Sequence, residues 1–86
     1  MYVVLAYDVN QKRVGKVLKI CRKYLTHIQK SVFEGGITEA KLATLKRELM
    51  QVIDCEVDSI CIYEWQSMKY TRKEEIGTVE DHGNIF

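Results

Sequence analysis

The sequence predicts one α+β domain in which an antiparallel sheet is covered on one face by two helices. Its 86 residues have room for a single core. Two segments carry apolar residues at helical spacing, and short β-rich runs stand before, between and after them. A domain of this size buries a modest share of its surface, so its stability is expected to depend on a second copy. We therefore expect a homodimer.

The first element is an apolar run, residues 2–7, that ends at Asp8. It is too short for an ordinary helix and rich in β-forming residues, which favours a central strand covered on both faces. Asp8 then stands at the C-terminal edge of this strand.

The first helix is expected to follow, with Asn10 as its N-cap. Its apolar positions repeat at the 3, 4, 7 spacing of a buried stripe. They are Val14, Val17, Leu18, Cys21, Tyr24 and Leu25. The opposite face is almost purely cationic and consists of Lys12, Arg13, Lys16, Lys19, Arg22 and Lys23.

Residues 26–37 have strand character, but their alternation breaks near Gln29 and Lys30. Either two short strands meet there or one strand bulges, and the sequence leaves both readings open. Thr38 can cap a second helix. The buried stripe of that helix is Leu42, Leu45, Leu49, Val52 and Ile53.

Residues 58–65 alternate, with Ile60 and Ile62 on one side and Cys61, Tyr63 and Trp65 on the other. This strand completes a β-α-β-β-α-β order, which predicts a ferredoxin-like sandwich over residues 1–77. Residues 70–77 are expected to add a fifth, C-terminal strand. We expect the tail, residues 78–86, to dock on another surface, with the partner protomer as the first candidate, because it ends in two apolar residues.

Charge is distributed unevenly along the chain although the net charge is only +1. Residues 1–37 carry seven Lys or Arg against two acids, a net +5, and residues 38–86 carry six against ten, a net −4. One half of the fold can therefore present phosphate with a basic surface, and the alternative is an ordinary solvated helix face. No stretch is apolar enough to cross a bilayer, which favours a soluble cytoplasmic protein without a membrane partner.

Few residues are candidates for chemistry. Three cysteines without CxxC spacing support neither a disulfide framework nor a zinc site. Asp8 is the best catalytic and metal-binding candidate, because the end of a buried strand holds a carboxylate rigidly, although a local turn role is the simpler alternative. One carboxylate is a poor Mg²⁺ site, and a twofold dimer that paired two Asp8 residues would ease that objection. Arg13 is the basic residue expected closest to Asp8, and Phe33 either stacks a base or fills the core.

Four segments together resemble the CRISPR-associated protein 2 family over residues 1–77. They are Tyr7-Asp8, Lys12-Arg13-Val14, the Ile-Gln-Lys-Ser-Val-Phe-Glu-Gly run of residues 28–35, and residues 58–63. The resemblance implies a twofold dimer whose C-terminal segments cross to the neighbouring sheet. It also implies that Asp8 binds Mg²⁺ across the dimer axis, in a cleft lined by Tyr7, Arg13, Ser31 and Phe33.

The resemblance further implies one of two roles. Some members look like metal-dependent nucleases that cut single-stranded RNA or duplex DNA. The better-supported role is architectural, in which the dimer holds protospacer DNA between dimers of the CRISPR-associated protein 1 integrase. Gln11 stands where a basic residue is expected, so we favour holding over cutting. A small regulatory or ligand-binding ferredoxin-like domain without nuclease function is the alternative.

Overall fold

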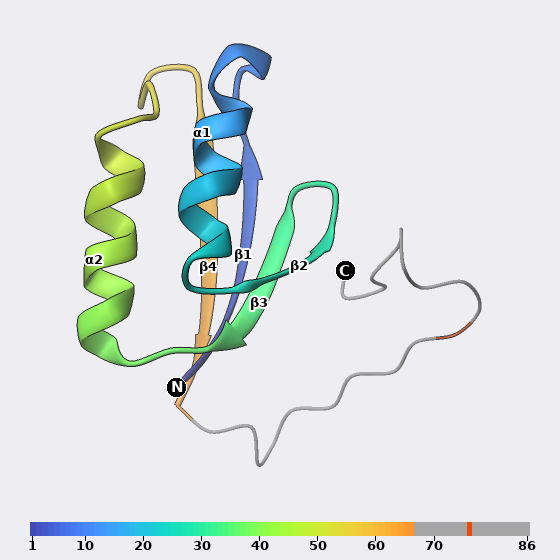
Figure 1. The fold of residues 1–86 in the computed structure, drawn as a ribbon, viewed down its shortest axis with the longest axis vertical. Coiled ribbons are helices and arrows are strands. Elements are labelled where there is room, and N and C mark those ends of the chain that lie inside the picture. The colour runs from blue at the N-terminus through green and yellow to red at the C-terminus, as the bar shows by residue number, and fades with distance from the viewer. Residues whose placement is uncertain (67–75, 77–86) are drawn as a thin grey trace.

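Two helices lie side by side against one face of a four-stranded antiparallel sheet in the computed structural model, which describes residues 1–66 and 76 (Figure 1). The sheet order is β2-β3-β1-β4. The elements are β1 (Tyr2–Asp8), α1 (Gln11–Arg22), β2 (Thr26–Gln29), β3 (Val32–Gly36), α2 (Glu39–Met50) and β4 (Ser59–Trp65). The predicted α+β class and its β-α-β-β-α-β order are confirmed, and the sheet order is that of a ferredoxin-like sandwich.

Strand β1 lies in the middle of the sheet, between β3 and β4. Val3 and Leu5 point towards the helices and are fully buried, and Val4 on the opposite face is only 3% exposed. The predicted central position of this strand is confirmed. Its cover on the second face is only partial in the described protomer, because Tyr2 and Ala6 on the side of Val4 are half-buried. This position explains why the run is apolar at both odd and even residues.

The segment between the helices contains both features that the sequence left open. A turn at Lys30 and Ser31 separates β2 from β3, and the pairing of the two strands shifts register between His27 and Gln29. The hairpin and the bulge thus lie next to each other, which is why the simple alternation fails there.

Both helices begin at the predicted caps. The Asn10 side chain accepts a hydrogen bond from the Lys12 N–H at 3.1 Å, and the Thr38 hydroxyl accepts one from the Lys41 N–H at 3.1 Å. Helix α2 ends at Met50. The predicted stripe residues Val52 and Ile53 lie beyond it and still pack against the core.

Strand β4 alternates as predicted. Ile60 and Ile62 pack against the core, while Cys61 and Tyr63 are exposed on the other face. Residues 67–75 and 77–86 lie outside the described residues, and with them almost all of the predicted fifth strand and the whole tail. Within the described part, no helix has the length and apolar character needed to cross a membrane.

Candidate functional site

Asp8 is the last residue of β1 and is exposed. It pairs with Ser59 of β4 across the sheet. Among residues 1–66 and 76, no group of three or more His, Cys, Asp or Glu side chains could hold a metal ion. The described residues of one protomer therefore do not form a Mg²⁺ site of three or more such ligands around Asp8, and Asp8 fits the ion only if further oxygen ligands come from outside them.

Asp58 is the main residue of this region that sequence reasoning missed. Its side chain is fully buried, and the Arg13 guanidinium binds it through Nε at 2.6 Å and a second nitrogen at 3.0 Å. The same carboxylate accepts the backbone N–H groups of Asn10 at 2.9 Å and Asp54 at 2.8 Å. These hydrogen bonds, that of Arg13 above all, hold the pKa of Asp58 far below its ordinary value of 3.8.

The Asp58 network fixes the turn that follows Asp8. It joins the start of α1, the loop after α2 and the start of β4, which are separated along the chain but meet at one carboxylate. Arg13 was expected beside Asp8, and the described hydrogen bonds of its guanidinium all go to Asp58. Its guanidinium is thereby committed to an internal ion pair, with its two-pronged geometry matched to that carboxylate.

Three of the four residues predicted to line the cleft, Tyr7, Ser31 and Phe33, gather around the β2–β3 hairpin. The Tyr7 hydroxyl donates a hydrogen bond to the Lys30 carbonyl at 3.1 Å, and the Tyr7 N–H donates one to the Ser31 carbonyl at 3.0 Å. Burial raises the pKa of the Tyr7 hydroxyl above its ordinary value. Phe33 is fully buried, with its ring stacked on His27 at a centroid distance of 4.5 Å. The core interpretation of Phe33 is confirmed, and its ring is not open to a base in the described protomer.

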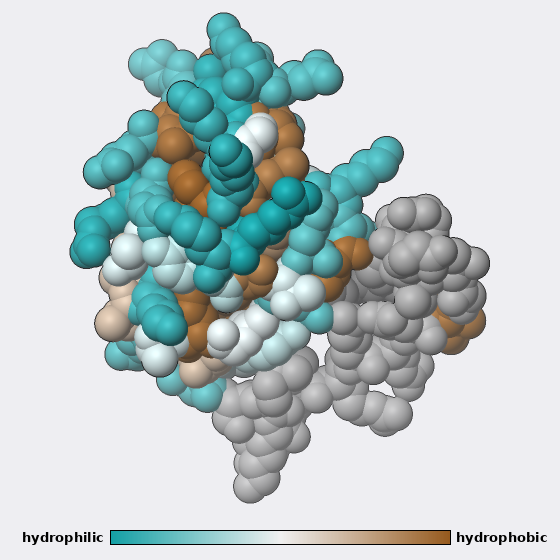
Figure 2. Space-filling model, in the orientation of Figure 1, coloured by the Kyte–Doolittle hydropathy of each residue, from teal (hydrophilic) through white to brown (hydrophobic). Residues whose placement is uncertain are grey.

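The cations on the basic face of α1 fall into two groups. The side chain of a committed cation pairs with an acidic side chain among the described residues, and that of an uncommitted cation does not. Besides Arg13, Lys23 is committed, because its ammonium group binds the carboxylate of Glu48, which also accepts the Tyr24 hydroxyl. The uncommitted cations are exposed, and their side chains form no hydrogen bond or ion pair within the described part of the chain. They are Lys12, Lys16, Lys19 and Arg22. Figure 2 shows hydrophilic side chains projecting from the helix-bearing face.

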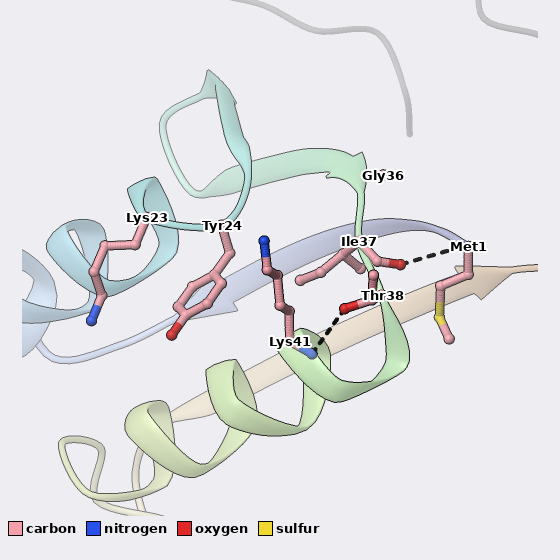
Figure 3. A pocket seen from close by; sticks show the side chains of 7 residues that line it. All are labelled: Met1, Lys23, Tyr24, Gly36, Ile37, Thr38 and Lys41. Carbon is pink, nitrogen blue, oxygen red and sulfur yellow. Dashed lines mark hydrogen bonds between the residues drawn. The ribbon is translucent and has the colours of Figure 1, made fainter.

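A cavity of about 410 Å³ lies at the C-terminal end of α1 (Figure 3). Lys41 extends from α2 between Tyr24 and Ile37, and the Met1 ammonium group donates a hydrogen bond to the Ile37 carbonyl at 3.2 Å. No acidic side chain lines it. The lining residues are Met1, Lys23, Tyr24, Gly36, Ile37, Thr38 and Lys41. Positive charge therefore continues past the end of α1, on the side away from Asp8.

Comparison with known proteins agrees with this architecture. Residues 1–73 match the family model described as CRISPR associated protein Cas2. The chain is 51% identical to the CRISPR-associated endoribonuclease Cas2 of Dictyoglomus turgidum over 77 residues, which cover 90% of this chain and 88% of that protein. It is 45% identical to the protein of the same name from Thermotoga maritima over the full length of both chains.

Solved structures give the same result. A crystal structure of Cas2 superposes with a TM-score of 0.82 at 38% identity, covering 92% of this chain and 88% of the other. Streptococcus pyogenes Cas2 superposes with a TM-score of 0.78 at 37% identity, covering 90% of this chain and all of the other. With the sheet order, the strand-end Asp8 and the basic first helix in place, the chain belongs to the family of CRISPR-associated Cas2 proteins.

Proposed function

We propose that the protein is the nucleic-acid-binding subunit of CRISPR spacer acquisition, acting as a homodimer in the cytoplasm. In this role it holds protospacer DNA together with the CRISPR-associated protein 1 integrase. The observation that carries the proposal is the set of four uncommitted cations on one face of α1, namely Lys12, Lys16, Lys19 and Arg22. Family membership supplies the CRISPR context.

The geometry of this face suits a phosphate backbone. Lys12 and Arg22 are ten residues apart in a helix, which corresponds to about 15 Å. This is roughly the axial length of four base pairs of duplex DNA, each of which carries two phosphates. Because no described acid pairs with these side chains, their full charge is available to a polyanion.

We propose that a second copy of the chain covers the sheet face that lacks helices. On that face β1 and β4 place Tyr2 opposite Trp65, Val4 opposite Tyr63, and Ala6 opposite Cys61. Tyr63 is 45% exposed. A sheet with helices on one side only needs another layer over such an apolar and aromatic surface. A twofold dimer would also add a second Asp8.

We further propose that Asp8 binds Mg²⁺ and supports phosphodiester hydrolysis, as the name endoribonuclease of the relatives suggests. Such an ion acts by activating a water molecule and neutralising phosphate charge. This chain would contribute the Asp8 carboxylate, while the Asp58 network holds the turn behind it. One carboxylate per protomer leaves the ion dependent on the second copy and on substrate phosphate, so we rank cutting below holding.

The test measures binding and cleavage of labelled duplex DNA and single-stranded RNA, with Mg²⁺ or with EDTA. Asp8→Ala is expected to abolish any cleavage and to leave binding intact. Lys19→Glu is expected to weaken binding, whereas Lys46→Glu, a charge reversal at an exposed residue of α2 that pairs with Glu64 at 3.5 Å, is not.

Two results would contradict the proposal. If wild type bound neither probe at low salt, the regulatory or ligand-binding alternative would stand in its place. If Lys19→Glu and Lys46→Glu weakened binding equally, only the overall charge would matter and the α1 face would have no specific role.

A further inference from the structure

Gly15 occupies the middle of α1, where nothing in the described structure requires a glycine. The residue is exposed, and a Cβ atom built there would meet no atom within 4 Å. Gly35 is the described glycine with positive φ, so Gly15 has a backbone that any residue can adopt. Neither packing nor backbone conformation among residues 1–66 and 76 explains its presence.

A glycine at this position weakens the helix. It loses more conformational freedom on folding than any other residue and is less favourable than alanine in a helix interior. Helix α1 has only 12 residues, so each of its positions matters for its stability. A close approach by another molecule would account for a glycine at this position.

The surroundings of Gly15 indicate what approaches it. Lys12 lies one turn before it and Lys19 one turn after it on the same helix face. Lys16 directly follows Gly15 and Arg22 lies about two turns beyond it, and all four cations are uncommitted. The helix backbone at Gly15 is thus bare between two flanking cations, Lys12 and Lys19.

We infer that the sugar-phosphate backbone of a nucleic acid makes its closest approach to the protein over Gly15. Without a side chain there, a phosphate group can lie between the ammonium groups of Lys12 and Lys19 and contact both. A larger residue would fill that space and push the phosphate away from the flanking cations. The inference rests on the proposed nucleic-acid function and adds the point of contact.

A second copy of the chain is the competing occupant, because helices also approach each other closely at glycine. Two copies of this face would bring eight like charges together around the two glycines, and like charges across an interface oppose association. A polyanion is attracted by the same arrangement. The four uncommitted cations therefore favour nucleic acid over a second copy of the chain as the occupant of this face.

The test compares Gly15→Leu with Ala43→Leu, which adds the same side chain at an exposed position of α2. The probe is labelled duplex DNA or single-stranded RNA, whichever wild type binds more tightly, at about 50 to 200 mM salt. Gly15→Leu is expected to weaken binding about tenfold and to reduce the slope of log K against log salt by about 0.9 for each lost phosphate contact. Ala43→Leu is expected to bind as wild type does.

Gly15→Ala tests whether misfolding explains weaker binding in Gly15→Leu. It is expected to raise the melting temperature by roughly 5 °C, because alanine favours the helix, and yet to weaken binding about twofold. A more stable protein that binds less well supports close approach at this residue.

Wild-type affinity and slope in both Gly15 variants would overturn the inference. Lys16→Glu separates this failure from failure of the proposed function. If Lys16→Glu weakens binding and the Gly15 variants do not, nucleic-acid binding stands and the contact lies elsewhere. If none of these variants changes binding, both the contact and the α1 face are wrong.

Discussion

The number of α1 cations that contact phosphate can be counted from the salt dependence of binding. Each contact contributes about −0.9 to the slope of log K against log salt. Sequence periodicity placed six basic residues on this face, whereas the structure commits Arg13 and Lys23 to internal acids and leaves four free. Four contacts predict a slope of about −3.6 for one protomer face, and six would predict about −5.4.

The difference is large enough to measure. Between 50 and 200 mM salt, a slope of about −3.6 lowers affinity roughly 150-fold, and one of about −5.4 lowers it roughly 1,800-fold. Fluorescence anisotropy with labelled duplex DNA measures the affinity at each salt concentration. A dimer that engages two faces would double each expected slope.

A comparison of two single substitutions tests the division of the cations whatever the number of faces engaged. Lys19→Ala is expected to reduce the slope by about 0.9 for each face engaged, because Lys19 is uncommitted. Lys23→Ala is the matched control and is expected to leave the slope unchanged, because its charge is already neutralised by Glu48. Equal losses in the two variants would refute the division of the helix face into free and committed cations.

Four further predictions concern the fold around the site and the proposed dimer interface. The hydrogen bonds of Asp58 lower its pKa, so their stabilisation is full above the ordinary value of 3.8 and is lost as pH falls below it. Urea unfolding at decreasing pH should show this loss of stability in wild type. Asp58→Asn should be less stable than wild type at neutral pH, and its free energy of unfolding should fall less as pH decreases. Phe33→Ala should lower the free energy of unfolding in urea by about 3–5 kcal/mol, because the ring is fully buried. An unchanged free energy of unfolding would contradict a core role and favour a role in a binding cleft. Burial raises the pKa of Cys21 to about 12, so mass spectrometry should find Cys55 alkylated and Cys21 unmodified in the native protein. Cys61 should lose its reactivity at concentrations where dimers form, and equal labelling of Cys55 and Cys61 at every concentration would contradict the proposed interface.

Local features were predictable because they depend on neighbouring residues. Asn10 and Thr38 cap the helices as expected, since a cap needs only a side chain near its own backbone. The helical stripes and the alternation of β4 follow from spacing alone. Asp8 was placed at a strand end for the same reason. The hairpin and bulge of residues 26–37 stayed open because they depend on which strands pair.

The class of fold, the order of its elements and the strand-end position of Asp8 before a basic helix could all be predicted from sequence patterns. Which charges of that helix are available depends instead on contacts between segments that are distant along the chain. Arg13 meets Asp58 across 45 residues and Lys23 meets Glu48 across 25. Helical spacing shows which side chains share a face, but an ion pair depends on distance in space, which only the packed elements set.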